Sequence, residues 1–375
     1  MLYHSRERLQ RPPMENDLIR KADEILYDLT HRFRILDYIN PTNRLEEKEK
    51  FLTAWKNGET YQPQFEYKKL PTSLPKIIND LQNLLFDADP VSKMFEETRD
   101  KFAALANTLQ FRGTEEFSQT VVQVYGVPNP NDATEAKAYL KKNSRSNRPM
   151  EAGVRALSEI LKNKIREERI DGWEINEDPL CIDLAELDSS HHKIRLQTGM
   201  LFTKKAMRRL RSRLIHVQLY RCLNGERQPY KMFGVGLAGS YASDEALAMD
   251  HEEKFSLLDP ETARYYVGKR LACALALRHS FRGVFSRLEN YFDLETAYGL
   301  TESVKRGLVD TAQTGAWIRD HACFIEQKKI SNLSTDDLQV LYTGRFPVHH
   351  LNTVKEMIAK EWLLPPAFLP KTFSN

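Results

Sequence analysis

The chain has 375 residues, of which 29% are charged and 41% hydrophobic, a balance typical of a folded globular protein. Its formal net charge of +3 is small for this length, so charge alone predicts no nucleic-acid partner. No apolar run approaches the ~20 residues needed to cross a bilayer, and residues 1–8 lack the apolar region of a secretory signal. We therefore expect a cytoplasmic protein without a membrane span.

Helical periodicity dominates the first part of the chain. Apolar residues recur at intervals of three and four, which predicts amphipathic helices. The predicted helices cover about 18–33, 44–55, 72–86 and 91–109, and a further one ends at Tyr125-Gly126. The polar, charged stretch 141–149 is the best candidate for a boundary. The sequence thus predicts an N-terminal helical region over 1–148 and a second domain over 149–375.

The periodicity changes after a predicted helix at about 150–167. Segments 173–175, 181–185 and 192–196 alternate as strands do. A long helix at about 203–223 follows, and the chain is mainly helical again from 243 to about 343. We therefore predict an α+β fold, mainly α, with a small antiparallel sheet in the second half.

Cysteine and histidine give no recognisable metal motif by themselves. The four cysteines (Cys181, Cys222, Cys273 and Cys323) form no CxxC pair, which indicates isolated buried thiols. No HExxH motif occurs, and the adjacent pairs His191-His192 and His349-His350 fall in predicted turns. Because neighbouring side chains point in different directions on a regular element, we expect solvated loops at both pairs rather than metal ligands.

A basic amphipathic helix is predicted over 204–213. Its cations are Lys204, Lys205, Arg208, Arg209, Arg211 and Arg213. Met207, Leu210, Leu214 and Val217 fall on the opposite face at helical spacing. This pattern fits a solvated face opposite a core face, and it also fits a surface that binds an anionic polymer or membrane.

Five separate segments together resemble one family. They are Asp37-Tyr38-Ile39-Asn40-Pro41-Thr42-Asn43 with 63–67, Gly113-Thr114-Glu115-Glu116-Phe117, Asn224-Gly225-Glu226-Arg227-Gln228-Pro229, Lys305-Arg306-Gly307-Leu308, and 364–370. In order and spacing they are similar to the microtubule-associated tyrosine carboxypeptidases, whose bacterial relatives are the flavohaemoglobin expression-modulating QEGLA-motif proteins. The resemblance runs from about residue 30 to 370. It implies a metallopeptidase-like core of the gluzincin type.

The resemblance implies a zinc site, but the matching residues depart from it. The family's HExxxH motif supplies two histidine ligands and a glutamate general base, and a downstream glutamate is the third ligand. Alignment on Asn224-Gly225 puts Arg213 and Gln218 at the histidine positions, Leu214 at the base position and Glu245 at the third ligand. We therefore expect no bound zinc, and an ion pair between Arg213 and Glu245 in its place. His216 is a weak substitute ligand, because a helix points it away from the face of Gln218.

The same resemblance suggests a few binding residues. Arg306 is retained and would hold a substrate carboxylate or pair within the protein. Arg319 and Asp320 lie in a second, altered family motif, and Tyr220 lies one turn after the lost ligand. We expect an inactive homologue that binds a peptide or protein C-terminus. The alternative is an active metallo-carboxypeptidase with a metal site rebuilt around Glu245 and His216, and Arg306 and Tyr220 would then be candidate catalytic residues.

Overall fold

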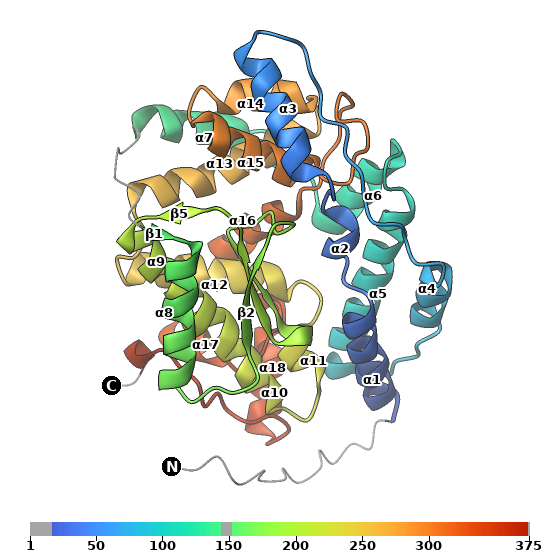
Figure 1. The fold of residues 1–375 in the computed structure, drawn as a ribbon. Coiled ribbons are helices and arrows are strands. Elements are labelled where there is room, and N and C mark those ends of the chain that lie inside the picture. The colour runs from blue at the N-terminus through green and yellow to red at the C-terminus, as the bar shows by residue number, and fades with distance from the viewer. Residues whose placement is uncertain (1–16, 144–151, 374–375) are drawn as a thin grey trace.

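The computed structural model describes residues 17–143 and 152–373 as a mainly helical protein with two small sheets (Figure 1). The α+β, mainly α class predicted from the sequence is confirmed. The proposed boundary between 148 and 149 lies outside the described residues and stays a prediction. Within the described ranges no helix is long and apolar enough to cross a membrane.

The helices before residue 143 lie in different parts of the molecule, and α7 packs against α13. In Figure 1, α1, α4, α5 and α6 stand together, while α3 lies near α14 and α15. Their bounds are α1 Asp17–Arg32, α2 Leu36–Ile39, α3 Arg44–Lys56, α4 Leu74–Gln82, α5 Pro90–Gln110, α6 Glu116–Tyr125 and α7 Asp132–Lys142. The start of α5 is fixed locally, because Asp89 accepts hydrogen bonds from the backbone N–H groups of Val91 and Ser92, and Pro90 occupies the first turn.

The strands lie in the middle of the chain and form two sheets. β1 Ala152–Gly153 pairs with β5 Leu201–Phe202, and β4 Lys193–Gln197 lies between β2 Glu174–Asp178 and β3 Ala185–Asp188. The expectation of a purely antiparallel sheet is wrong in one respect, because β2 and β4 run parallel. Strand β4 lies between β2 and β3, pairs antiparallel with β3 and runs parallel to β2.

Helices make up most of the remaining chain. Their bounds are α8 Val154–Glu167, α9 Lys204–Arg211, η2 Ser212–Leu219, α10 Tyr220–Glu226, α11 Met232–Val235, α12 Ser240–Lys254, α13 Pro260–Ala276, α14 Phe281–Leu288, α15 Leu294–Lys305, α16 Arg319–Ile330, α17 Thr335–Leu341, η3 Val348–His350 and α18 Leu351–Ala359. The long helix predicted at 203–223 is the run α9–η2–α10, whose middle section η2 is a π-helix. Three-residue 3₁₀ turns lie at Ser189–His191 and Lys371–Phe373.

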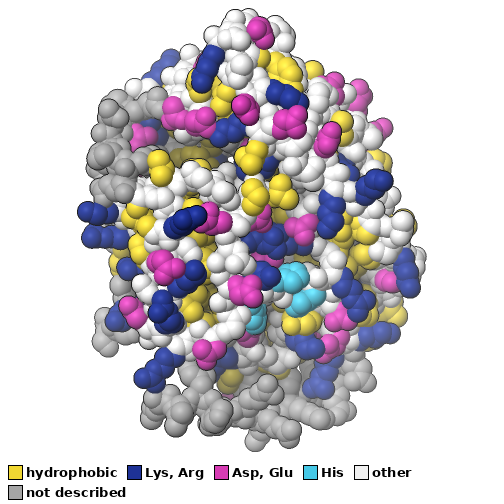
Figure 2. Space-filling view, in the orientation of Figure 1, with side chains coloured by type: hydrophobic (Ala, Val, Ile, Leu, Met, Phe, Trp, Pro, Cys, Tyr) yellow, Lys and Arg dark blue, Asp and Glu magenta, His cyan; other side chains and the backbone are white. Residues whose placement is uncertain are grey.

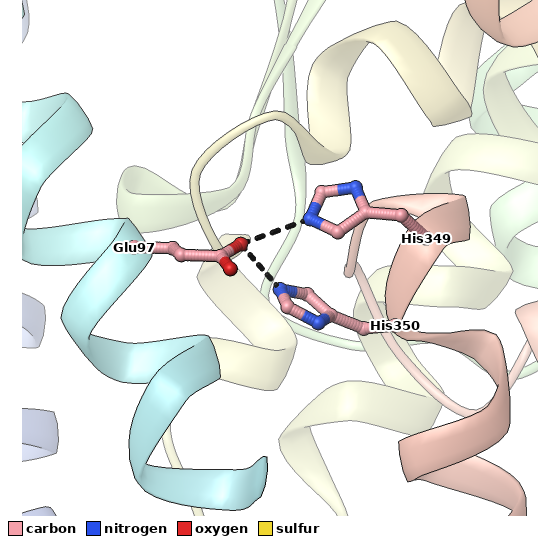
Figure 3. A group of neighbouring side chains, drawn as sticks. All are labelled: Glu97, His349 and His350. Atoms are coloured by element: carbon pink, nitrogen blue, oxygen red, sulfur yellow. Dashed lines mark hydrogen bonds and ion pairs between the residues drawn. The ribbon is translucent and has the colours of Figure 1, made fainter. Parts of the chain in front are cut away.

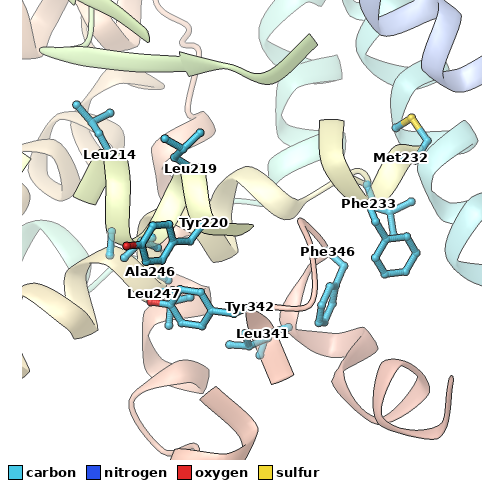
Figure 4. Packing of buried hydrophobic residues seen from close by; sticks show 14 of the residues in the cluster. Leu214, Leu219, Tyr220, Met232, Phe233, Ala246, Leu247, Leu341, Tyr342 and Phe346 are labelled. Atoms are coloured by element: carbon cyan, nitrogen blue, oxygen red, sulfur yellow. The ribbon is translucent and has the colours of Figure 1, made fainter. Parts of the chain in front are cut away.

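Two hydrophobic cores stabilise the fold. One surrounds η2, α10 and α11 and includes Leu214, Phe233 and Tyr342 (Figure 4). The other is rich in aromatic rings from α3, α14 and α15, such as Phe51 and Phe281, whose centroids lie 4.9 Å apart. Both cores combine side chains from before and after residue 148. Burial therefore ties the N-terminal helices to the rest of the chain.

Three of the sequence segments that carry the family resemblance meet in space. Gly307 donates its backbone N–H to the hydroxyl of Tyr67, at 2.7 Å, and its carbonyl accepts from the N–H of Gly113, at 3.0 Å. Gly307 has a φ of +91°, and a Cβ atom there would lie 2.2 Å from the ring of Phe117. Only glycine suits this position, because a larger residue would separate the 305–308 segment from the other two segments that it contacts.

The Asn-Gly-x-x-Gln-Pro segment holds the C-terminal stretch against α10. Asn224 accepts hydrogen bonds from the N–H groups of Ala367 and Phe368 at 2.8 and 2.9 Å, and donates to the carbonyl of Phe368 at 2.8 Å. Gln228 bonds both the N–H and the carbonyl of Leu364. Residues 364–368 form no helix or strand, and these two buried side-chain amides hydrogen-bond their backbone groups instead.

The face shown in Figure 2 carries a mixture of acidic and basic side chains, with histidines gathered near its middle. Cations and anions alternate over this face and form no broad patch of one sign. Such a surface gives no electrostatic footprint for nucleic acid on this side of the molecule.

Candidate functional site

The wide turn of η2 brings together residues that an α-helix would separate. Arg213 and Gln218 are five residues apart, which in an α-helix is roughly 140° around the axis. In a π-helix the hydrogen bonds run from i to i+5, so residues at this spacing lie nearly above one another. Both side chains consequently reach the same partner on α12, Glu245. Arg213 Nη1 lies 2.7 Å from Glu245 Oε2, and Gln218 Nε2 lies 2.8 Å from Glu245 Oε1.

A second carboxylate on α12 extends this contact into a network. Glu252 is fully buried and accepts from Arg213 Nε at 2.8 Å and from Arg209 Nη1 at 3.2 Å. The hydroxyl of Tyr266 on α13 donates to Glu252 at 2.6 Å and accepts from Arg213 Nη2 at 2.6 Å. The five residues Arg209, Arg213, Glu245, Glu252 and Tyr266 form what we call the α12 ion-pair network.

The charges in this network reinforce one another. Burial alone would raise the pKa of Glu252, but the cations of Arg213 and Arg209 hold it below its usual value. Burial disfavours the charged form of Arg213, yet Glu245 and Glu252 keep its pKa well above the usual value. Arg213 is therefore a permanent cation at the centre of the site.

These side chains do not fit a zinc ion. A guanidinium has no lone pair to donate to a metal, and the Gln218 nitrogen is itself a hydrogen-bond donor. Both carboxylate oxygens of Glu245 already accept hydrogen bonds from Arg213 and Gln218. Among the described atoms at this position, only Gln218 Oε1 is a buried acceptor left without a partner. The donor set at this position thus favours an ion pair over a metal.

The other residues expected near the site lie apart from it. Leu214, at the general-base position, is completely buried in the hydrophobic core (Figure 4). His216 hydrogen-bonds Ser212 at 3.3 Å, and its ring lies 6.3 Å from that of His251. Tyr220 bonds Glu168 and packs on Phe368. The structure therefore brings Arg213, Gln218 and Glu245 together, but it directs His216 and Tyr220 elsewhere.

Arg319 and Asp320 belong to a neighbouring charged cluster. Arg319 pairs with Asp183 at 2.9 Å, and its guanidinium lies 3.9 Å from the ring centroid of Tyr241. Asp320 accepts from the Tyr241 hydroxyl at 3.1 Å and pairs with Lys269 at 3.1 Å. Although burial alone would raise the pKa of Asp183, Lys269 and Arg319 hold it well below its usual value.

Arg306 lies behind this cluster. It is 1% exposed, and it donates to the side-chain oxygen of Asn40 at 3.1 Å. Its Nε has no hydrogen-bond partner among the described residues. The structure therefore places Arg306 in the interior, close enough to add its charge to Asp183 and Asp320, and it lines neither of the two cavities described next.

A cleft adjoins both groups of charges. Its volume is about 280 Å³, and its walls come from α1, α5, β3, the 235–241 segment and α16. A smaller cavity of about 90 Å³ contains Arg213, Gln218 and Glu245. Tyr241, Arg345, Glu186 and Leu187 line both hollows. The α12 ion-pair network therefore lies directly behind one wall of the cleft.

The cleft has apolar walls and one cation without an acidic partner. Apolar lining residues include Phe33, Phe102, Leu105 and Trp317. Lys101 of α5 also lines the cleft and lies 5.6 Å from the ring centroid of Tyr125. Within residues 17–143 and 152–373, no carboxylate lies within ion-pairing distance of Lys101. Burial lowers the pKa of Lys101, and the more distant carboxylate of Glu326 offsets this effect only in part.

The basic helix predicted at 204–213 does not present all its charges to solvent. Arg209 and Arg213 are buried to 5% and 6% exposure within the α12 ion-pair network. Lys205 bonds the carbonyl of Leu258 at 3.2 Å, while Arg208 is exposed. Internal pairing therefore removes Arg209 and Arg213 from the expected anionic-surface site.

The sequence did not predict the roles of three residues of the network, Glu252, Arg209 and Tyr266. Glu252 follows Glu245 by seven residues, two helical turns, so both carboxylates lie on one face of α12. Arg209 precedes Arg213 by four residues and faces them from α9. Two acids on one face of a helix and two arginines on one face of another are a pattern that predicts ion pairs between the two helices. Tyr266 gave no such signal, because its hydroxyl arrives from a different helix.

The fold and the site define a mainly helical α+β protein in which two facing helices bury a charged site beside an apolar cleft. A family model described as microtubule-associated tyrosine carboxypeptidase matches residues 49–375. The chain therefore belongs to the microtubule-associated tyrosine carboxypeptidase family, as the sequence resemblance predicted. No curated protein matches the chain.

Proposed function

We propose that this chain is a family member without zinc peptidase activity, which binds the C-terminus of a peptide or protein in its cleft. The observation that carries the proposal is the contact of Arg213 and Gln218 with Glu245. If these are the family's three zinc-ligand positions, an ion pair now occupies the place of the metal. The altered ligands are those of a degenerate member of the group that includes the QEGLA-motif proteins.

The cleft offers the two features that recognition of a chain terminus needs. Its apolar walls suit the last side chains of a peptide, and Lys101 can pair with a terminal carboxylate. Tyr125 beside Lys101 limits hydration of the ammonium group. A carboxylate bound there would pair with Lys101, which forms no ion pair in the described part of the free protein. Binding would be confined to the cytoplasm, in agreement with four buried free cysteines.

The site supports binding better than hydrolysis. With Leu214 in the core, no carboxylate stands next to Arg213 in the chain to accept a proton from water. Arg319 and Asp320 are engaged with Asp183, Tyr241 and Lys269 and serve to shape the cleft wall. The alternative, an active carboxypeptidase rebuilt around Glu245 and His216, lacks a contact between these two residues in the described chain.

Peptide binding can be tested with a matched pair of variants. Fluorescein-labelled peptides with free and amidated C-termini would be titrated with wild type, Lys101→Gln and Lys76→Gln. Lys76 is an exposed lysine of α4 and serves as the control. We expect the free carboxylate to bind about tenfold more tightly than the amide, an advantage of ~1.4 kcal/mol that Lys101→Gln removes. Equal binding of both peptides by wild type would refute the proposed carboxylate recognition.

The lost metal site can be tested by restoring its ligands. Arg213→His combined with Gln218→His would present two imidazoles and Glu245 on the wide face of η2. We expect this double variant to hold one more zinc per chain than wild type, measured by elemental mass spectrometry after dialysis. If wild type itself holds zinc that Glu245→Gln releases, the rebuilt-site hydrolase replaces our proposal.

A further inference from the structure

The histidine pair at 349–350 is arranged differently from the sequence expectation. We expected diverging side chains in a solvated loop, but the pair lies in the 3₁₀ turn η3, with ring centroids 4.1 Å apart. Both rings point toward Glu97 of α5 (Figure 3). Glu97 Oε2 lies 3.0 Å from His349 Nε2 and 3.1 Å from His350 Nε2. The expectation is wrong because a tight turn, unlike a regular helix or strand, allows adjacent rings to converge.

We propose that Glu97, His349 and His350 form a binding site for a divalent transition-metal ion of the zinc type. One carboxylate and two imidazoles are a ligand set typical of such ions. The three ligand atoms lie within 4.8 Å of one another. Ligands ~2.0–2.2 Å from a tetrahedral metal lie roughly 3.2–3.6 Å apart. The two distances from Glu97 Oε2 to the imidazole nitrogens, 3.0 and 3.1 Å, are within a few tenths of an ångström of that range.

The exposure of the three ligands suits an ion that enters from solvent. His350 is buried, with 8% of its side chain exposed, whereas Glu97 and His349 are exposed to 40% and 48%. The buried imidazole fixes the inner side of the site. The outer side is open, so water or an external ligand would complete the coordination.

The backbone that carries the histidines is held in place before any metal binds. The N–H of Val348 donates to the Ser243 hydroxyl at 2.9 Å, and that hydroxyl donates to Glu326 at 2.9 Å. The N–H of His350 donates to the carbonyl of Pro347 at 3.0 Å. Because the turn is anchored on α12 and α16, metal binding needs little reorganisation.

One nearby charge opposes the ion. Lys93 precedes Glu97 by one turn of α5, and its ammonium acts electrostatically on His350. The positive charge of Lys93 repels a divalent ion and therefore weakens, but does not remove, the affinity of the three ligands for it. Lys93→Gln should therefore bind the metal more tightly than wild type.

A bound ion would connect distant parts of the chain at the edge of the cleft. Glu97 and His349 are 252 residues apart in sequence. Lys101, one turn beyond Glu97, lines the cleft, and a Cβ atom on the neighbouring cleft residue Gly239 would lie 3.4 Å from Pro347. The ion would tie α5, which lines the cleft, to η3, which follows the Pro347 that packs beside Gly239 in the cleft wall.

The test is zinc titration by isothermal calorimetry on untagged protein stripped with chelator. We expect one site per chain in wild type that is lost in both His349→Ala and Glu97→Gln. Loss of a residue that only supports a ligand lowers metal affinity 10–100-fold, so loss of a ligand itself should lower zinc affinity at least ~100-fold. His191→Ala, from the other histidine pair, should bind as wild type does. Zinc should also raise the unfolding temperature of wild type and His191→Ala, but not of the two ligand variants.

Other outcomes would overturn the proposal. Zinc binding that survives in His349→Ala and Glu97→Gln, or that disappears in Glu245→Gln, would place the ion elsewhere. Absence of saturable binding by wild type below millimolar zinc would mean that the three side chains form an ion-paired contact only. By contrast, lost zinc binding in His349→Ala together with an unfolding temperature equal to that of metal-free wild type would support the proposal, because the loss would then not come from unfolding.

Discussion

Replacing Arg213 by methionine tests the α12 ion-pair network most directly. The substitution keeps the bulk of the side chain but removes hydrogen bonds to Glu245, Glu252 and Tyr266. Glu252 is completely buried, so it would keep only Arg209 and Tyr266 as partners. Removal of one partner from a buried ion pair costs about 3–5 kcal/mol, because the remaining charge is left uncompensated. We expect the free energy of unfolding to fall by that amount.

Urea unfolding at pH 7.5, followed by circular dichroism, measures the difference through the midpoint and slope. Arg208→Met is the matched control, since Arg208 is an exposed arginine on the same basic segment and should change stability by less than ~0.5 kcal/mol. Glu245→Gln should cost less than Arg213→Met, because Arg213 keeps Glu252. If Arg213→Met is as mild as Arg208→Met, the network contributes nothing to stability and our reasoning fails.

Three further predictions concern stability. Burial lowers the pKa of both His216 and His251 to about 4, below their unfolded value, so the unfolded chain takes up protons first as the pH falls. The free energy of unfolding should then drop between pH 6.5 and 4, by up to ~3 kcal/mol per histidine; a urea midpoint that stays constant over this range would contradict it. Asn224→Ala should release residues 364–368, seen as faster amide exchange at Phe368, whereas unchanged exchange would argue against the anchor. Gly307→Ala should lower the unfolding temperature strongly, because the new methyl group meets Phe117 at a positive φ; a mild effect would mean that the ring moves aside.

The sequence was sufficient for most of the helical framework. The helices at 44–56, 90–110 and 154–167 agree with the predicted ranges to within a few residues. The last two have an apolar stripe along one face, whereas the helix at 44–56 also buries the polar side chains of Arg44 and Glu47. The parallel pairing of β2 and β4 was not predictable from alternation alone. Alternation identifies strands, but it does not show that the later strand β4 lies between β2 and β3, or in which direction it pairs with each.

The candidate site was predictable in part. The Arg213–Glu245 ion pair was expected from the aligned positions, and the structure contains it. The contribution of Gln218 required the π-helix, which helical periodicity does not reveal. The convergence of His349 and His350 on Glu97 was not predicted, because Glu97 lies 252 residues before His349 in the sequence and only the tertiary fold brings it to the two histidines.

The wide turn of η2 amounts to one extra residue inserted into the helix α9–α10. Deleting a single residue there would rotate everything that follows by roughly 100°. Asn224 would then turn away from residues 367–368, and the C-terminal stretch would lose its support. The downstream packing thus preserves the widened helix by itself, whatever occupies the space between Arg213 and Gln218. In this chain, the spacing of Arg213 and Gln218 is thus held from two sides, by their shared contact with Glu245 and by the packing of residues 367–368 on Asn224.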